Sequence, residues 1–548
     1  MALQVVWFKR DLRLHDHRPL VEAALRGPVL PLYVAEPELW QRPDSSARQW
    51  SFCCEALQEL RQELAGLGQP LVVRVGEVVA VLEAAHRRHG IAALWSHQET
   101  GNLWTYGRDR RVAAWARDRG IPWRECTSFG VIRGLKERRG WARAWEVRMG
   151  EPLLAAPDAL PPLAGVQPRE LPAASDLGLA ADPCPGRQPG GRRAGLELLD
   201  GFLQQRGRGY HHQLSSPLTA FEACSRLSPH LAWGTLSLGE VVQRTRSRRA
   251  ALAERPATAT AGWPRALDAF LSRLHWHCHF IQKLESQPSI EILELHPATR
   301  GLRCTDPGRL AAWSHGRTGV PFVDACMRAL RASGWINFRM RAMLLSFASH
   351  HLWIDWRDSG LHLARQFVDY EPGIHWSQCQ MQSGTTGINT IRIYNPIKQG
   401  LDHDPEGLFL ARWLPELAGV PAVWRHEPWR MDPATQEASG CCIGRDYPAP
   451  IVEVAAAARE ARERLWGLRR QPGFGAAADA IQARHGSRRS GLPPSGRGGR
   501  RRRQRIGDGQ LELDLGMLLS PGQETDRRSS ATPREALHVP LPEAAESS

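Results

Sequence analysis

The first hundred residues alternate short apolar runs with longer amphipathic stretches, and no other feature of the chain restricts its fold as much. The apolar runs LQVVWF, PVLPLYV, LVVRV and IAALWS occupy residues 3–8, 28–34, 71–75 and 91–96. Amphipathic stretches lie between them, at 48–67 and 77–89. Buried strands that alternate with helices of this length predict βαβ units and a parallel sheet. We therefore expect residues 1–130 to form a doubly wound α/β domain.

The remaining chain divides by composition. Proline, alanine and glycine dominate residues 151–195, so we predict an interdomain linker over 131–195. Apolar residues then recur at three- and four-residue spacing, which predicts a large all-α domain over 196–470, with helices at 261–285, 320–333, 336–351 and 360–367. Residues 471–548 are rich in Gly, Pro, Arg and Ser, and we predict that they form a disordered basic tail. Within it, LELDLGMLL at 511–519 is either a short docking motif or a chance pattern.

Length and charge restrict the class of protein. A chain of 548 residues exceeds the size at which one hydrophobic core keeps growing, so two domains are expected. The formal net charge of +14 favours binding to a polyanion, nucleic acid above all, although GRGGRRRRQR at 496–505 supplies part of that excess. The first predicted strand is not followed by GxGxxG, which argues against an NAD-type pyrophosphate turn.

Cysteine usage and the N-terminus indicate the compartment. The eleven cysteines form no CxxC array, so the sequence predicts neither a zinc ribbon nor an iron–sulfur site, and no metal. The N-terminal segment MALQVVWFKRDLRL has no signal-peptide architecture, and no apolar run approaches the roughly 18 residues that span a bilayer. We expect a monomeric cytoplasmic protein with free thiols and no membrane contact.

Two clusters in the helical part have alternative interpretations. In CSRLSPHLAWGTLS, 224–237, Pro229 marks a helix start, and Ser225 and Ser228 either bind a phosphate there or act as an ordinary N-cap. In FLSRLHWHCHF, 270–280, His275 and His279 share a helical face. That spacing suits zinc, but no third ligand accompanies the pair, so structural histidines are the favoured interpretation.

A third cluster combines basic and acidic groups. Arg339 and Arg341 lie in the otherwise apolar run GWINFRMRAM and need anionic partners if they are buried. Asp369 and Glu371 open the stretch DYEPGIHWSQCQMQSGTTGIN and are the natural candidates. The pattern predicts either structural ion pairs or a helical pocket that holds an anionic ligand.

Several ordered motifs resemble the photolyase and cryptochrome family. They are WFKRDLRLHD (7–16), WSHGRTGVPFVDACMRAL (313–330), SGW (333–335), IDWR (354–357), RIYNP (392–396), DPEGLFLARWLPEL (404–417), HEPW (426–429) and DYPAPIVE (446–453). The resemblance covers residues 1–465. It implies an α/β antenna domain, a helical domain that holds FAD, and an electron transfer driven by blue light.

The resemblance also implies site residues, position by position. Those expected to bind FAD are Tyr210, Cys224, Ser225, Arg226, Leu227, Ser228, Phe270, Arg273, His277, Arg341, Asp369, Tyr370, Glu371 and His375. Those expected to act in catalysis are Trp276, His375 and Trp356. Those expected to contact DNA are Trp276, which would stack on a flipped-out dimer, Arg339 and Met381.

Several positions depart from the family's pattern. Arg273 stands where cyclobutane-dimer photolyases carry a substrate-binding glutamate, and Phe338 replaces an asparagine that contacts the dimer. The histidine pair of six-four photolyases is absent, because its positions carry Asn337 or Phe338 and Ala342. Further replacements are Cys224 for threonine, His277 for arginine, Glu371 for aspartate, and His375 for the asparagine, aspartate or cysteine near flavin N5.

The tryptophan chain that feeds electrons to flavin in this family is also interrupted. Trp356 matches its middle member, but Cys379 and Arg303 occupy the other two positions. Trp353 and Trp376 lie nearby in the sequence and offer a different route.

Three functions remain open at this stage. The first is a DNA photolyase that repairs ultraviolet-induced pyrimidine photoproducts in DNA. The second is a cryptochrome-like photoreceptor in which His375 titrates near neutral pH beside the flavin and the tail reaches a protein or nucleic-acid partner. The third is a nucleic-acid-binding module with a vestigial flavin pocket. A second antenna chromophore, whether folate, deazaflavin or flavin, would lie near HQETGNLWTYGRD at 97–109.

Overall fold

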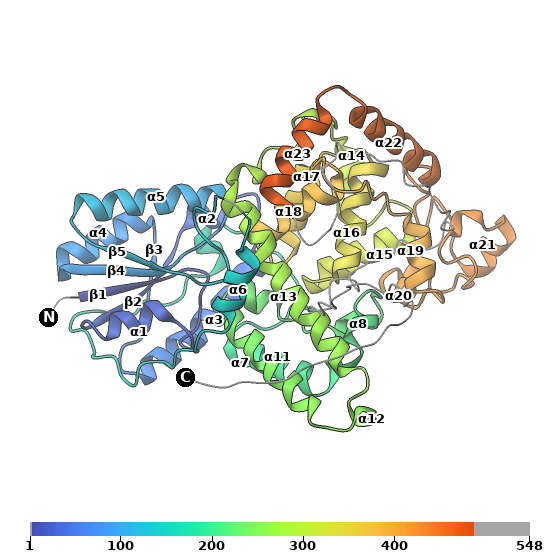
Figure 1. Ribbon diagram of the computed structural model, residues 1–548. Coiled ribbons are helices and arrows are strands. Elements are labelled where there is room, and N and C mark those ends of the chain that lie inside the picture. The colour runs from blue at the N-terminus through green and yellow to red at the C-terminus, as the bar shows by residue number, and fades with distance from the viewer. Residues whose placement is uncertain (1–2, 137, 487–548) are drawn as a thin grey trace, which may run out of the picture. The chain divides into compact units, whose positions relative to one another are not determined.

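The computed structural model describes residues 3–136 and 138–486 (Figure 1). Its N-terminal part contains a five-stranded, all-parallel sheet in the order β3-β2-β1-β4-β5. The strands are β1 (Leu3–Phe8), β2 (Val29–Ala35), β3 (Val72–Val75), β4 (Ile91–His97) and β5 (Trp123–Cys126). The four predicted strands and the doubly wound α/β fold are confirmed. Strand β5 was not predicted, because WREC is short and half polar.

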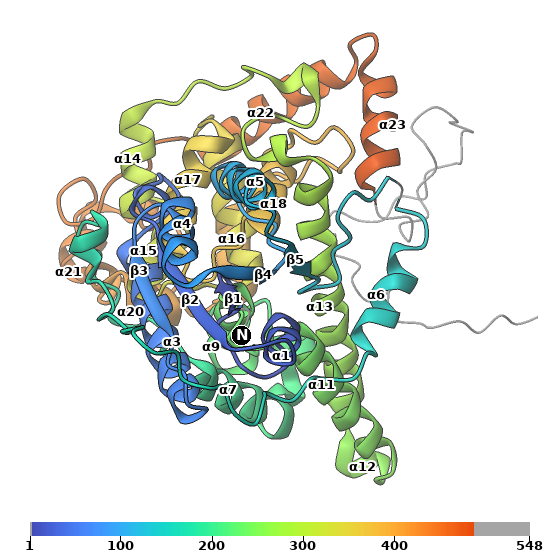
Figure 2. The ribbon, with the colours of Figure 1, turned by 90° about the vertical axis from the view of Figure 1, so that its left-hand side faces the viewer.

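Helices cover both faces of the sheet (Figure 2). They are α1 (Arg18–Ala24), α2 (Pro37–Trp40), α3 (Ala47–Gly66), α4 (Val78–His89) and α5 (Leu103–Asp118). Alternate side chains of a strand point to opposite faces. Accordingly, Val5 and Trp7 of β1 share a core with α4 and α5, whereas Val6 and Phe8 share another with α1 and α3. Every side chain of β1 is buried, as expected for a central parallel strand.

The segment predicted as a linker packs along the α/β part. It contains α6 (Trp141–Met149) and a short 3₁₀ turn at Ala174–Leu177, and is otherwise without helix or strand between 150 and 191. Leu160 and Leu177 are buried in the core beneath α3. The indole of Trp50 donates a hydrogen bond of 3.1 Å to the Pro172 carbonyl. The linker is therefore anchored by burial and by backbone hydrogen bonds.

The rest of the described chain is helical, which confirms the predicted all-α part. Its helices are α7 (Arg192–Gln204), α8 (Tyr210–Gln213), α9 (Ala220–Ala223), α10 (Ser228–Ala232), α11 (Leu238–Ala253), α12 (Ala257–Thr260), α13 (Trp263–Ser286), α14 (Pro307–His315), α15 (Pro321–Ser333), α16 (Phe338–Ser346), α17 (Trp356–Gln366), α18 (Pro372–Ser383), α19 (Pro396–His403), α20 (Leu408–Trp413), α21 (Pro433–Ser439) and α22 (Val454–Arg469). A π-helical turn at Phe347–His351 follows α16. The long helix α13 packs against α11 and α18, and α18 also packs against α16 and α17.

The prediction that disorder begins at residue 471 is wrong for one segment, because α23 spans Phe474–His485. Its alanines favour a helix, and its ends are fixed by tertiary contacts. Phe474 stacks on His296 at a centroid distance of 3.7 Å, and His485 Nε2 lies 2.7 Å from Gln287 Oε1. The basic run at 496–505 and the motif at 511–519 lie outside the described residues.

Across residues 3–136 and 138–486, every helix is too short or too polar to cross a bilayer.

A buried carboxylate joins two of the recognised motifs. Asp324, in the first turn of α15, accepts hydrogen bonds from the Thr318 amide and hydroxyl (2.8 and 2.7 Å), the Gly319 amide (3.0 Å) and the Tyr447 hydroxyl (2.6 Å). Burial raises the pKa of this carboxyl to about 6. Asp324 therefore connects the turn before α15 to a segment more than a hundred residues away in the chain.

We expect Asp324→Ala to lower the free energy of unfolding by about 3–5 kcal/mol, because several buried donors lose their acceptor at once. The urea-denaturation midpoint would measure the loss. The exposed Asp402, which pairs only with Lys398 on the surface, gives the matched control Asp402→Ala, expected to shift stability by less than about 1 kcal/mol. Equal effects of the two variants would contradict the structural role of Asp324.

Candidate functional site

An arginine–aspartate pair lies at the centre of the candidate site. Arg341 of α16 donates two hydrogen bonds to Asp369, with Nη1–Oδ1 at 3.0 Å and Nη2–Oδ2 at 2.8 Å. Its Nε donates to the Ile336 carbonyl at 2.8 Å, and the guanidinium lies 4.0 Å from the Phe367 ring centroid. The pairing of these two residues, 28 positions apart, was predicted from the sequence and is confirmed. Such two-pronged geometry fixes the plane of the guanidinium.

Glu371 was expected to serve the same arginines, and that expectation is wrong. Its carboxylate lies 3.7 Å from Arg10, which follows β1, whereas Arg339 Nε is buried without a hydrogen-bond partner in the described chain. Arg10 also donates to the carbonyls of Ala232 and Tyr370. The sequence could not reveal this contact, because it joins residues 361 positions apart. Its only signal was the placement of Arg10 inside WFKRDLRLHD.

Several guanidinium groups converge on the loop before α10. The Cys224 thiol interacts electrostatically with Arg226, Arg206, Arg273 and Arg341. Burial raises the pKa of this thiol to about 12, against the influence of the guanidinium groups. The predicted residues Cys224, Arg226, Arg273 and Arg341 are therefore neighbours, although they come from three separate segments of the chain.

One of these arginines has a strained backbone and an aromatic support. Arg226 has φ = 60°, a conformation rarely adopted by residues other than glycine. Its guanidinium lies 4.1 Å from the Trp335 ring centroid and 5.0 Å from that of Phe221. Burial lowers its pKa to about 10, although Asp369 acts in the opposite direction. The strain and the burial together hold a positive charge at a defined place.

The guanidinium groups around Asp369 carry more positive charge than this one carboxylate can balance. Asp369 is already engaged with Arg341, so the charges of Arg226 and Arg273 are not balanced by it. Arg273 forms a hydrogen bond with the buried Tyr210. Partly buried cations without a matched anion are costly, and a pyrophosphate would offset that cost. The donor set therefore fits the phosphate groups of FAD.

An arginine that was not predicted, Arg206, shapes the loop. Its guanidinium donates to the carbonyls of Leu198 (2.8 Å), Glu222 (3.0 Å) and Ser225 (2.7 Å), and to that of Cys224. Arg206 therefore acts through the backbone of the loop and not through its charge alone. No sequence motif distinguished it from the other arginines.

The predicted helix start at Pro229 is confirmed as α10, a helix of five residues. Ser228 Oγ accepts a hydrogen bond of 3.2 Å from the Trp335 indole, and Ser225 Oγ lies 3.5 Å from the Leu227 amide. Leu227 is buried in the core with Phe270. Phosphate binding by the two serines stays a prediction.

His375 does not match its predicted role as a group that titrates near neutral pH. Burial lowers its pKa to about 4, so the imidazole is neutral at physiological pH. Its Nε2 lies 2.9 Å from the Gly360 carbonyl and 3.4 Å from Cys379 Sγ. This burial disfavours a charged imidazole at neutral pH, and the sequence alone did not reveal it.

The residues expected to face DNA come from α13, α16 and α18. Trp276 is half-buried, edge-on to His279 at 4.9 Å and stacked on Phe280 at 5.6 Å. His277 packs edge-on against Phe129 at 5.3 Å, and burial lowers its pKa to about 4. Arg339 and Met381 are also half-buried. Within the described chain no hydrogen bond or ring contact joins Trp276 to either, so their joint action stays a prediction.

The structure distinguishes between the two alternative tryptophans. Trp376 lies edge-on to Trp356, with ring centroids 5.9 Å apart and an interplanar angle of 87°. Trp353 instead lies between two guanidinium groups, 4.8 Å from Arg303 and 4.7 Å from Arg464. Of the two, only Trp376 extends the aromatic contact of Trp356 among the described residues.

A small cavity lies where the antenna chromophore was expected. Its volume is about 70 Å³, and its lining includes Glu99, Asn102, Thr105 and Arg108 of the predicted segment. Pockets that bury a drug-sized ligand usually measure about 300–1,000 Å³. The cavity as it stands is too small for a flavin or a folate, so a second chromophore stays a prediction that requires side chains to move.

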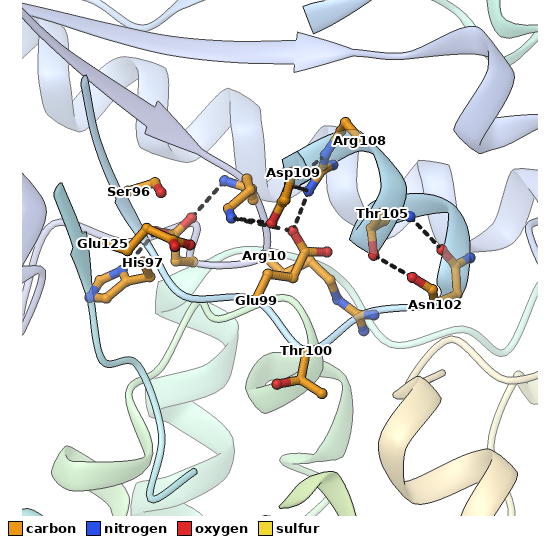
Figure 3. Close-up of polar contacts among 12 residues, drawn as sticks. Arg10, Ser96, His97, Glu99, Thr100, Asn102, Thr105, Arg108, Asp109 and Glu125 are labelled. Carbon is orange, nitrogen blue, oxygen red and sulfur yellow. Dashed lines mark hydrogen bonds and ion pairs between the residues drawn. The ribbon is translucent and has the colours of Figure 1, made fainter. Parts of the chain in front are cut away.

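Charged groups fill this region (Figure 3). Arg108 bonds to Glu99 at 2.7 Å, to Asp109 at 2.8 Å and to Glu36 at 3.2 Å, and Lys9 lies 3.3 Å from Asp109. Burial raises the pKa of Glu36 to about 7. The network explains the small volume, because paired side chains occupy the carboxyl ends of β1, β2 and β4.

Metal-ligating groups gather at one place in the described chain, at Asp11, His17 and His97. Asp11 Oδ2 lies 2.9 Å from His17 Nε2 and 2.7 Å from His97 Nδ1, so the ring nitrogens already share hydrogen bonds with the carboxylate. The histidine pair that the sequence offered as an alternative, His275 and His279, packs against tryptophan rings. His275 packs edge-on against Trp141 and Trp145, and His279 packs against Trp276. All eleven cysteines are free thiols.

Comparison with known proteins gives consistent matches. Residues 4–132 match the DNA photolyase family, and residues 270–467 match the FAD binding domain of DNA photolyase. A deoxyribodipyrimidine photo-lyase of Streptomyces griseus is 31% identical over 491 residues, covering 85% of this chain and 100% of that protein. A cryptochrome DASH of Gloeobacter violaceus is 30% identical over 490 residues, covering 83% of this chain and 95% of that protein. The solved structure of a Synechocystis cryptochrome has a TM-score of 0.76 at 23% identity and covers 84% of this chain and 99% of that chain.

Proposed function

Because the chain belongs to the DNA photolyase and cryptochrome family, we propose that it repairs ultraviolet-induced pyrimidine photoproducts in DNA as a light-dependent FAD flavoprotein. The observation that carries the proposal is the Arg341–Asp369 pair amid the unbalanced guanidinium groups of Arg226 and Arg273. The pair belongs to the segment matched to the FAD-binding domain, 270–467.

Different residues of the chain bind different parts of FAD. Arg226, Arg273 and the hydroxyl of Ser225 bind the pyrophosphate, which balances their charge. Arg341 and Asp369 orient the isoalloxazine ring. When bound, FAD supplies a group that absorbs blue light and exchanges single electrons. Asp369 and Glu371 each expose 7% of their surface, which would limit the access of water to a bound ring.

DNA binding follows from charge and from Trp276. The formal net charge of +14 attracts the phosphate backbone. A flipped-out pyrimidine dimer stacks on the Trp276 ring, and Arg339 and Met381 contact the lesion or the phosphate beside it. Arg339 supports this assignment, because its buried Nε has no hydrogen-bond partner in the described chain.

The experiment is a repair assay on oligonucleotides that carry one defined lesion, either a cyclobutane dimer or a six-four product. Protein with chemically reduced flavin is illuminated, and restored thymines are counted. Since base–aromatic stacking contributes about 1–3 kcal/mol, we expect Trp276→Ala to weaken lesion binding about 10- to 100-fold. Trp466→Ala, at a half-exposed indole on α22, is the control and should leave binding unchanged.

A second candidate, a cryptochrome-like photoreceptor, is favoured by one observation. Arg273 occupies the position of the lesion-binding glutamate and is engaged with Tyr210, so it offers the lesion no hydrogen-bond acceptor. Failure to repair either lesion, with photoreduction of the flavin retained, would favour the receptor. A purified protein without flavin absorption would instead support the nucleic-acid-binding module.

A further inference from the structure

Four basic side chains gather where the end of α13 meets α23. They are Arg138, from the loop between β5 and α6, His279 and Lys283 of α13, and His485 of α23. They expose 8%, 6%, 9% and 1% of their surface. Lys283 and Arg138 both act electrostatically on His279 and on His485, so the four lie together. Arginine and lysine are rarely buried unless an acid pairs with them.

Several polar atoms of this cluster have no partner in the described chain. Arg138 Nη2 donates to the His279 carbonyl at 3.0 Å, but its Nε and Nη1 are buried without an acceptor. His485 Nε2 donates to Gln287 Oε1 at 2.7 Å, which leaves Nδ1 as a buried nitrogen without a partner. Lys283 Nζ lies 4.9 Å from the Phe280 ring centroid and forms no hydrogen bond or ion pair with a described residue.

No acidic group of the described chain offsets the positive charge. Burial and the charge of Arg138 lower the pKa of Lys283 to about 7, and burial lowers that of Arg138 to about 10. Both pKa values fall because these cations are removed from water without an anion beside them. An unpaired buried charge is costly, and an anion bound between the two cations would offset that cost.

The free donors suit a phosphate group. Arg138 offers two unused N–H atoms, Lys283 offers up to three, and the two side chains come from different elements. A phosphate group carries several strong oxygen acceptors, whereas a carboxylate has two oxygens in one plane. His485 Nδ1 can accept a hydrogen bond from a protonated phosphate oxygen, or donate one when it is itself protonated.

The cluster lies near the residue expected to stack on a lesion. Trp276 stacks on Phe280 with ring centroids 5.6 Å apart, and Lys283 Nζ lies 4.9 Å from the centroid of the same Phe280 ring. Seven residues of α-helix separate Trp276 from Lys283, which is about 10 Å along the axis. Successive phosphates of a DNA strand are about 3.4 Å apart along the duplex axis, so this distance corresponds to about three nucleotides.

We propose that Arg138, Lys283 and His485 form a binding site for a phosphate group. Two sources supply this chemistry, a phosphate of a bound nucleic-acid strand and free inorganic phosphate. The strand as a source rests on the proposed function, because it requires DNA at Trp276. Binding of free phosphate does not depend on repair.

The test uses FAD-loaded protein, in which the pyrophosphate site of Arg226 and Arg273 is filled. Inorganic phosphate is titrated at constant ionic strength, and its dissociation constant is measured by calorimetry. Lys283→Met should weaken phosphate binding about tenfold or more, because a charge-assisted hydrogen bond is lost, and Arg138→Gln should do the same. Without phosphate, Lys283→Met should raise the thermal midpoint, because it removes an unpaired buried charge.

Two further variants serve as controls. Lys398→Met, at an exposed lysine of α19, should leave phosphate affinity and thermal midpoint unchanged. Glu137 precedes Arg138 in the chain and lies outside the described residues, and Glu137→Gln should also leave phosphate affinity unchanged. Wild type that binds no phosphate, or a thermal midpoint that falls in Lys283→Met without phosphate, would overturn the inference.

An oligonucleotide distinguishes the two sources of phosphate. If a strand phosphate occupies the site, the oligonucleotide should block the phosphate titration, and Lys283→Met should reduce the salt slope of its binding by about one. If only free phosphate binds there, Lys283→Met should leave oligonucleotide binding unchanged while phosphate binding is still lost. A protein that binds phosphate at this site but repairs no lesion would contradict the proposed function and support the site.

Discussion

Asp369→Asn should leave the purified protein largely free of FAD. The substitution keeps the size of the side chain but removes the charge that holds Arg341, whose two hydrogen bonds to Asp369 measure 3.0 and 2.8 Å. It also leaves the charge of Arg341 uncompensated and removes the negative charge that raises the pKa of Arg226. A lost charge-assisted pair of this kind weakens binding by about 3 kcal/mol, or roughly a hundredfold.

The measurement is the flavin-to-protein absorbance ratio after purification, followed by titration of FAD into the apoprotein. Arg341→Lys should have a similar effect, because an ammonium cannot form the two-pronged bond. The surface pair Lys398–Asp402 supplies the control Asp402→Asn, which should retain FAD like wild type. Full FAD content in Asp369→Asn would place the flavin elsewhere in the fold.

The sequence predicted local secondary structure better than it predicted contacts between residues far apart in the chain. Continuous apolar runs predicted β1 to β4, because parallel strands are buried on both faces. A three- to four-residue period predicted the long helices, because burial on one face imposes that period. The prediction failed at α23, where composition suggested disorder but the contacts of Phe474 and His485 with distant residues hold a helix. Tertiary contacts of this kind leave no local signal.

In the candidate site, too, one contact was predicted from the sequence and another was missed. Arg341 and Asp369 were predicted as partners, because a guanidinium in an apolar helix needs an anion. The contact of Glu371 with Arg10 was missed, since it depends on how β1 lies against the start of α18. The prediction that His375 titrates near neutral pH was wrong, because burial, which the sequence does not show, lowers the pKa of this histidine.

The burial of neutral histidines has a consequence for the whole protein, which is a steep loss of stability in acid. Burial lowers the pKa of His230, His351 and His375 to about 4, from a usual value near 6.5. The unfolded chain therefore binds protons between these pH values that the folded chain excludes. Their contribution to stability is full above about pH 6.5 and is lost as the pH falls towards 4, by about 3 kcal/mol for each.

Other titratable groups change how strongly stability depends on pH, but they do not reverse the loss of stability in acid. Burial lowers the pKa of His97 and His485 to about 3, and it also lowers that of His279. Against them, burial raises the pKa of Glu36 and Glu291 to about 7, and these carboxyls stabilise the fold as the pH falls. Because the buried histidines outnumber the carboxyls with a raised pKa, the fold loses net stability as the pH falls from about 6.5 towards 4. We expect cooperative unfolding between about pH 6 and 4.5.

His351 provides the sharpest test of this prediction. Both of its ring nitrogens are buried without a hydrogen-bond partner in the described chain, and the ring stacks on Phe347 at 4.9 Å. His351→Phe should keep the packing and remove one titrating group, which would lessen the acid-induced fall in thermal midpoint between pH 7.5 and 5. His315→Phe, at an exposed position, should leave that fall unchanged. A thermal midpoint independent of pH in wild type would mean that these histidines bind protons equally in the folded and unfolded states.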